Sequence, residues 1–176
     1  MAAPKEPPKA KLVCGIMWSN DDARDSAVKK LAGKFGEIDS ESETYDFSFT
    51  DYYEDEMGRG IKKKIVSFRN LISREALPSI KIFTNQVEEE ASGSKKRAVN
   101  LDSGYLTEHN VVLASAKERP HKPYIGEGIF ADVVLMFRSG NYEAHRYTFP
   151  DHKEQLVRDY YKKVREIYLK QRKNNA

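Results

Sequence analysis

Cysteine is nearly absent from this 176-residue chain, which contains one, Cys14, together with four scattered histidines. A single cysteine cannot form an intramolecular disulfide, and so few thiol and imidazole groups exclude a structural zinc site. Cys14 lies in an apolar run, so we expect a buried thiol and a cytoplasmic protein. A nucleophilic role for Cys14 would require a neighbouring histidine and a lowered pKa.

Long hydrophobic runs are also missing. No apolar stretch approaches the ~20 residues that span a bilayer, so we expect no membrane association. Residues 1–9 are rich in proline and lysine and lack the apolar segment of a signal peptide. The length predicts one domain over residues 11–171, with a disordered tail over 1–10 and a frayed tail over 172–176.

An excess of charge of one sign is absent as well. The chain has 30 Lys and Arg against 27 Asp and Glu, a net charge of +3. This mild excess is compatible with an anionic ligand, but it lacks the concentrated basic stripe of most nucleic-acid-binding proteins. Basic clusters at 62–64, 95–97 and 170–173 keep a non-catalytic nucleic-acid-binding or protein-interaction module open as the alternative.

Hydrophobic periodicity predicts an α+β fold. Strands are expected over 11–18, 44–50, 63–69, 111–116 and 129–137, with a hairpin strand over 142–147. Helices are expected after 19–22, within 73–91 and after Pro150, although 80–84 is also compatible with a strand. This order predicts a ferredoxin-like β-α-β-β-α-β sandwich with an added β-hairpin strand and a C-terminal helix.

The glycine-rich loop of P-loop nucleotide-binding proteins is missing. The first predicted strand leads into Ser19-Asn20-Asp21-Asp22, which places two carboxylates where a P-loop would hold phosphates. No Asn-Lys-x-Asp sequence is present either. A P-loop enzyme is therefore excluded, whereas nucleotide binding of another kind stays open.

The densest polar segment of the chain runs from 97 to 105, and we expect it to form a loop before the strand 111–116. Arg97 suits an anion, Asn100 and Asp102 suit hydroxyl or amide groups, and Gly104 permits close backbone approach. Tyr105 would help to orient the ligand. The alternative is a turn whose Asn and Asp bond their own backbone and whose Tyr covers the core.

A second polar segment, 117–124, follows that strand. Lys117 and Arg119 would contribute positive charge, and His121 is the candidate general acid or base beside Asp102. The alternative is a solvated loop bounded by prolines.

Three further features are ambiguous. Lys81 and Asn85 share a predicted helix face with Glu88, and they either join the site or form an ordinary solvated ladder. If the ligand is a nucleotide, Mg²⁺ is possible, with Asp51, Glu56 or Asp102 as the oxygen ligands; otherwise 51–56 is a solvated loop. Asp132 interrupts an apolar strand and needs a partner if it is buried; a structural pairing with Lys or Arg is favoured over catalysis.

Several motifs together resemble one family. These are Phe49-Thr50-Asp51-Tyr52-Tyr53, Glu56-Met57-Gly58, Ile80-Lys81, Thr84-Asn85, Val99-Asn100-Leu101-Asp102-Ser103-Gly104-Tyr105-Leu106 and Gly128-Ile129-Phe130-Ala131. Over nearly the whole chain, the sequence resembles short bacterial and archaeal proteins catalogued as a domain of unknown function, in which Pro and Arg are favoured at Ser103 and Lys122. Some members carry an automatic GTP-binding label, and the resemblance implies no catalytic residues.

These observations favour a protein that binds, with or without turnover, an anionic or phosphorylated small molecule such as a nucleotide. The candidate binding residues are Lys81, Asn85, Arg97, Asn100, Gly104, Tyr105, Lys117 and Arg119, and the candidate catalytic residues are His121 and Asp102.

Overall fold

The computed structural model describes residues 3–50, 53–92 and 97–174. The strands in this part of the chain are β1 (Ala10–Trp18), β2 (Ile38–Glu41), β3 (Tyr45–Asp46), β4 (Lys62–Ile72), β5 (Val99–Leu106), β6 (Asn110–Ser115), β7 (Tyr124–Gly126), β8 (Ile129–Arg138) and β9 (Asn141–Glu143). The α-helices are α1 (Asp21–Phe35), α2 (Glu54–Met57), α3 (Leu77–Ala91) and α4 (Gln155–Asn174), with 3₁₀ turns η2 (Arg74–Ala76) and η3 (Asp151–Lys153).

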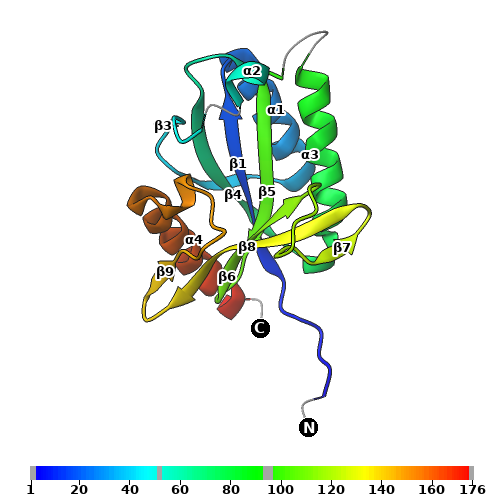
Figure 1. Ribbon diagram of the computed structural model, residues 1–176. Coiled ribbons are helices and arrows are strands. Elements are labelled where there is room, and N and C mark those ends of the chain that lie inside the picture. The colour runs from blue at the N-terminus through cyan, green and yellow to red at the C-terminus, as the bar shows by residue number, and fades with distance from the viewer. Residues whose placement is uncertain (1–2, 51–52, 93–96, 175–176) are drawn as a thin grey trace.

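All nine strands belong to one antiparallel sheet (Figure 1). Its order is β2-β4-β1-β5-β6-β8-β7, while β3 pairs with β4 and β9 pairs with β8. The predicted α+β class is confirmed. Apart from the short β3 and α2, the first elements, β1-α1-β2-β4-α3-β5, follow the expected β-α-β-β-α-β succession, and the ferredoxin-like label stays a prediction.

Strand β1 is central and buried along its whole length, as its two apolar faces predicted. One face, which includes Leu12, Cys14 and Ile16, packs against α1 and α3. Helix α1 begins at the predicted position, where the Asn20 side chain accepts a hydrogen bond from the backbone N–H of Ala23 (2.9 Å).

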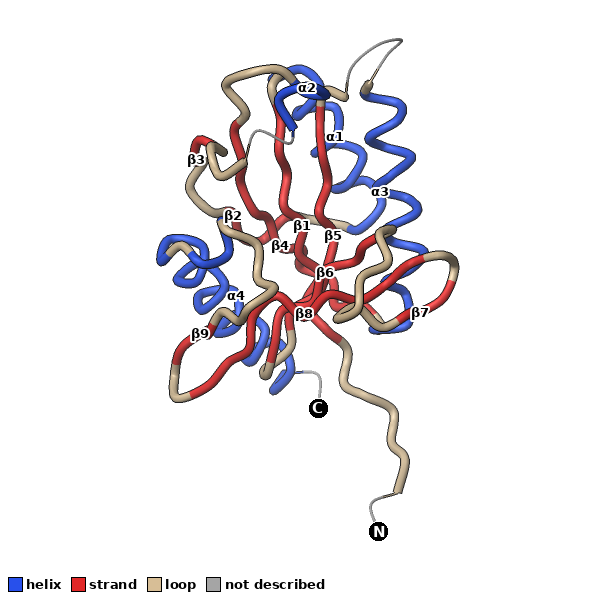
Figure 2. The backbone as a smooth tube through the Cα atoms, in the orientation of Figure 1, coloured by secondary structure: helices blue, strands red, loops and turns tan. Residues whose placement is uncertain are grey.

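The opposite face of the sheet is only partly covered by a helix. Helix α4 packs over Val13 of β1 and Ile65 of β4, and Figure 2 shows it on the other side of the sheet from α1 and α3. Farther along β1, Met17 belongs to a separate cluster with Met57 and Ile61. Between these clusters lies Gly15, which has no side chain to fill the space above the sheet.

The predicted strand over 44–50 is wrong for most of its length. Only Tyr45–Asp46 pair with β4. The longer strand on this edge of β4 is β2, whose sequence Ile-Asp-Ser-Glu shows little of the pattern of a strand. The alternating aromatic residues instead pack on one another, with ring centroids 5.4 Å apart for Phe47 and Phe49 and 5.9 Å apart for Phe47 and Tyr53. The alternation of aromatic and polar residues over 44–50 therefore corresponds to an aromatic cluster beside the sheet and not to a long strand.

The predicted loop over 97–105 is also wrong, because Val99–Leu106 form β5 beside β1. Asp102 lies opposite Gly15 and Asn100 opposite Met17. Strand β5 is therefore the fourth strand of the expected succession, and the predicted strand at 111–116 is the extension β6. Strands β5 and β6 pair only over Gly104–Leu106, next to the turn that joins them, and are separated along residues 99–103.

Both ends of the domain extend beyond the predicted limits. Ala10 begins β1, and α4 continues to Asn174. These ends hold each other, because the Tyr168 hydroxyl donates to the Lys9 carbonyl (2.7 Å) and Lys11 Nζ donates to the Gln171 side chain (2.8 Å). The hairpin strand is shorter than predicted, since β9 ends at Glu143. In the described part of the chain, no helix has the length and apolar character needed to cross a membrane.

Candidate functional site

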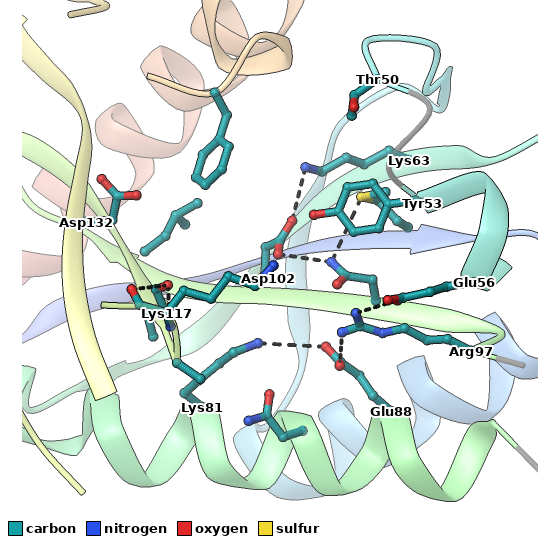
Figure 3. A pocket seen from close by; sticks show the side chains of 18 of the residues that line it. Thr50, Tyr53, Glu56, Lys63, Lys81, Glu88, Arg97, Asp102, Lys117 and Asp132 are labelled. Carbon is teal, nitrogen blue, oxygen red and sulfur yellow. Dashed lines mark hydrogen bonds and ion pairs between the residues drawn. The ribbon is translucent and has the colours of Figure 1, made fainter. Parts of the chain in front are cut away.

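A cavity of about 1320 Å³ opens on the sheet face that α4 leaves uncovered (Figure 3). Its wall combines β1, β4 and β5 with one side of α3, the end of β6 and the following loop, and the segments around α2 and η3. These segments are distant in sequence, so their convergence is a property of the fold. A concave site of this kind is the usual place for a small ligand.

Most of the predicted site residues line this cavity. They are Lys81, Asn85, Arg97, Asn100, Asp102, Lys117 and Arg119, and Glu56 lines it as well. The two polar segments therefore meet. Asp51 lies outside the described residues, whereas Gly104, Tyr105 and His121 are not part of the lining.

Gly104 and Tyr105 serve the packing of the sheet. A Cβ at Gly104 would lie 2.3 Å from the carbonyl oxygen of Val112, so glycine is needed where β5 and β6 approach each other. Tyr105 packs against a cluster that includes Leu77 and Val112, and burial raises the pKa of its hydroxyl. The interpretation of Tyr105 as a residue covering the core is confirmed.

His121 is not part of the cavity lining. Its ring stacks on Tyr147, with centroids 4.0 Å apart and an interplanar angle of 2°. Its Nε2 is 3.9 Å from Oδ1 of Asp132, which is beyond hydrogen-bonding distance. This position gives no support to proton transfer between His121 and a ligand in the cavity.

Asp102 lies in the floor of the cavity, held from two sides. Lys63 Nζ is 3.2 Å from its Oδ2, and Asn100 donates a hydrogen bond to its Oδ1 (3.0 Å). Burial alone would raise the pKa of Asp102, but the Lys63 and Lys81 ammonium groups and the Asn100 hydrogen bond together outweigh that effect, and the pKa lies below its ordinary value. The side chain remains 30% exposed. Asp102 is therefore an ionised, fixed hydrogen-bond acceptor, and a poor proton donor.

Sequence reasoning missed the centre of this network, Lys63. The side chain is buried, and its Nζ also lies 2.7 Å from Oδ2 of Asp151. Burial alone would lower the pKa of Lys63, but the two carboxylates raise it well above its ordinary value. Asp151 in turn contacts Tyr45 (3.1 Å) and His152 (3.0 Å). The alternation of side chains along a strand could have indicated that Lys63 is buried, since it places Lys63 on the face opposite Lys62 and Lys64.

Lys81 and Glu88 are buried, so the prediction of a solvated ladder is wrong for these two residues. Lys81 Nζ donates to the Leu101 carbonyl (2.8 Å), and Glu88 accepts from the Leu101 N–H (2.6 Å). Arg97 pairs with Glu88 and lies 3.6 Å from Glu56. Because β6 has separated from β5 here, α3 supplies the hydrogen bonds that a neighbouring strand would otherwise make.

The loop after β6 brings basic side chains to the cavity. Lys122 Nζ lies 2.9 Å from Oδ2 of Asp132 and donates to the Ser115 hydroxyl (3.2 Å). Arg119 is exposed and donates to the Glu118 carbonyl (3.2 Å), and Figure 3 shows the Lys117 side chain extending toward Asp102. No local pattern in the sequence predicted Lys122 as a site residue.

The other expected partners gain no support from this geometry. No group of three or more His, Cys, Asp or Glu side chains among the described residues is arranged to hold a metal ion, and Mg²⁺ stays a prediction. In the basic cluster 62–64, Lys63 is buried and Lys64 pairs with Glu41 (2.6 Å). That cluster is therefore not an open surface for phosphates.

Comparison with known proteins identifies a family. The model of a family described as "Domain of unknown function (DUF4416)" matches residues 8–168. No curated protein and no solved structure matches the chain.

Proposed function

Since the chain belongs to the DUF4416 family, whose function is itself unknown, we propose from the cavity alone that the protein binds an anionic or phosphorylated small molecule, such as a nucleotide, without a P-loop. The observation that carries this proposal is the convergence of two polar segments on one large cavity. At about 1320 Å³ the cavity exceeds the ~300–1,000 Å³ of typical ligand sites, so it has room for a nucleotide.

The anionic group of the ligand is best placed at the rim formed by the loop after β6. Arg119 lines the cavity and makes no ion pair with any residue in the described ranges. Its guanidinium is therefore available for the bidentate contacts that phosphate oxygens favour. Lys117 adds positive charge on the same loop.

The remainder of the ligand would lie over the floor. Asp102 accepts hydrogen bonds there from hydroxyl or amino groups, and Asn85 projects from α3 into the same space. Lys63, Lys81 and Arg97 are already engaged with protein groups, so their charges chiefly hold the site together. We propose binding rather than turnover, because Asp102 is held ionised and His121 lies outside the lining. The buried Cys14 suits a reducing, cytoplasmic location.

A thermal-shift and calorimetric titration with pyrophosphate and with adenosine mono- and diphosphate, each with and without Mg²⁺, tests this function. A ligand at 100 times its dissociation constant adds about 2.7 kcal/mol to the free energy of unfolding. We expect Arg119→Ala to weaken binding roughly tenfold or more, since it removes a charge-assisted contact. Arg138→Ala is the matched control, because Arg138 is an exposed arginine outside the cavity lining.

The result that overturns the proposal is a folded protein whose melting temperature no phosphate-bearing probe shifts. Binding that Arg119→Ala leaves unchanged would place the anion elsewhere in the molecule.

A further inference from the structure

Asp132 is the least satisfied charged group in the cavity wall. It lies within β8, opposite Leu113 of β6, and is 1% exposed. Neither carboxylate oxygen accepts a hydrogen bond from any residue that the structure describes. A buried carboxylate without donors is costly, because it loses its hydration and gains little in return.

The two basic side chains near Asp132 do not replace that hydration. Lys122 Nζ is 2.9 Å from Oδ2 but outside hydrogen-bonding geometry, and its hydrogen bond goes to Ser115. Near Oδ1, the Nε2 of His121 is 3.9 Å away. The pairing of Asp132 with a lysine, favoured from the sequence, is therefore present but incomplete.

An exposed aromatic ring lies close to the same carboxylate. Phe149 lines the cavity and is 40% exposed, although large apolar side chains are usually covered. The Lys122 ammonium that pairs with Asp132 also lies 5.6 Å from the centre of the Phe149 ring. A flat apolar surface beside a carboxylate with free acceptor positions matches one kind of chemical group, a planar ring that carries an amino substituent.

We infer that Asp132 and Phe149 form the subsite for an amino-bearing aromatic ring of the ligand. The inference rests on the proposed function, because the same ligand places its phosphate at the rim. The ring stacks on Phe149, and its amino group donates to Asp132. In the ligand-free protein Lys122 lies against Asp132; when the ligand binds, the lysine turns toward the phosphate and the amino group replaces it.

Two matched pairs of nucleotides test this subsite. Adenosine 5′-monophosphate is compared with purine riboside 5′-monophosphate, which lacks only the 6-amino group, and cytidine 5′-monophosphate with its counterpart lacking the 4-amino group. Calorimetric titration of the full chain gives each affinity, and pyrophosphate is measured alongside. In at least one pair we expect the amino-bearing member to bind roughly tenfold more tightly, as one hydrogen bond to a charged acceptor predicts.

Variants of the protein then show which residues cause the preference for the amino-bearing nucleotide. Asp132→Leu, which has no acceptor, should abolish the preference and leave pyrophosphate binding unchanged. Asp132→Asn is the variant to use if the leucine does not fold, and it should reduce the preference to about threefold or less. Phe149→Leu and Arg119→Ala should weaken both members of a pair equally. Asp25→Asn changes an exposed carboxylate on α1 and should behave like the wild type.

Equal binding of the two members in both pairs, or a preference that survives in a folded Asp132→Leu protein, overturns the subsite. Binding of pyrophosphate without any nucleotide overturns it too, while the proposed anion site stands. If no probe binds, pyrophosphate included, the proposed function fails as well.

Discussion

Single residues determine how closely the parts of this molecule approach one another. Gly104 permits the contact of β5 with β6, and Gly15 leaves space over the cavity floor, where a Cβ would lie 3.1 Å from Cε of Lys63. Lys63 then occupies that space and holds Asp102 and Asp151. The cavity therefore depends on two glycines that are not part of its lining as well as on these charged lining residues.

Gly104→Ala should destabilise the protein by about 1–3 kcal/mol, because the new methyl group would overlap the Val112 carbonyl. Gly33→Ala is the matched control. A methyl group at Gly33, within α1, would meet open space, so the change should raise stability by about 0.4–1 kcal/mol. Urea unfolding of both variants measures the effects, and an unchanged midpoint for Gly104→Ala would contradict the tight strand contact.

At the scale of elements, the separation of β6 from β5 creates the cavity and also exposes a strand edge. Helix α3 closes that edge with Lys81 and Glu88, one on the carbonyl and one on the N–H of Leu101. Helix α3 therefore makes the hydrogen bonds that a neighbouring strand would make with Leu101, and the cavity beside it stays open.

Glu88→Ala should cost about 1–3 kcal/mol, because the buried N–H of Leu101 and the Arg97 guanidinium both lose their acceptor. Amide hydrogen exchange gives the sharper measurement. Exchange at Leu101 should accelerate, whereas exchange at Leu106, at the other end of β5, should change less. Gln86→Ala on the exposed side of α3 is the control, and equal effects from the two variants would refute this role of the helix.

At the scale of the whole molecule, one ionic network joins both halves of the chain. It runs from Asp102 on β5 through Lys63 on β4 to Asp151 in η3, and continues through His152 to Tyr161 of α4 (3.2 Å). The network links the cavity floor to the packing of the C-terminal helix. Because the charges are buried, removal of one partner leaves the others uncompensated.

This network predicts a loss of stability in acid. Burial alone would raise the pKa of Asp151, but Lys63 and His152 hold it far below its ordinary 3.8, and the pKa of Asp102 is lowered as well. Below about pH 4 the unfolded chain therefore binds more protons than the folded one, and the free energy of unfolding falls as the pH falls. Above that pH, these two groups add no further slope.

Asp151→Asn should lower stability at neutral pH and reduce this acid slope, because one of the two depressed carboxyl groups is gone. Urea unfolding at a series of pH values between about 2 and 7 measures both quantities. Asp159→Asn, an exposed position on α4, is the control. An acid slope identical to that of the wild type would show that Asp151 is not a source of the acid sensitivity.

Local patterns in the sequence by themselves determined the α+β class, the central position of β1, the start of α1 and the turn before β9. These features depend on neighbouring residues, such as two apolar faces on one strand or Asn20 ahead of a helix. The tight turn at Ser139 and Gly140 is of the same kind, since both residues have positive φ.

Only the tertiary structure decided that 97–105 is a strand, that Lys63 is buried and that Asp132 lies in the cavity wall. The polar side chains of β5 led to the prediction of a loop, because a strand next to the centre of a sheet is usually apolar. Asn100 and Asp102 are tolerated there because they face the cavity and find partners on other strands, Asn100 on Met17 of β1 and Asp102 on Lys63 of β4. Such partners are distant in sequence, and their convergence follows from the path of the chain, which local patterns do not specify.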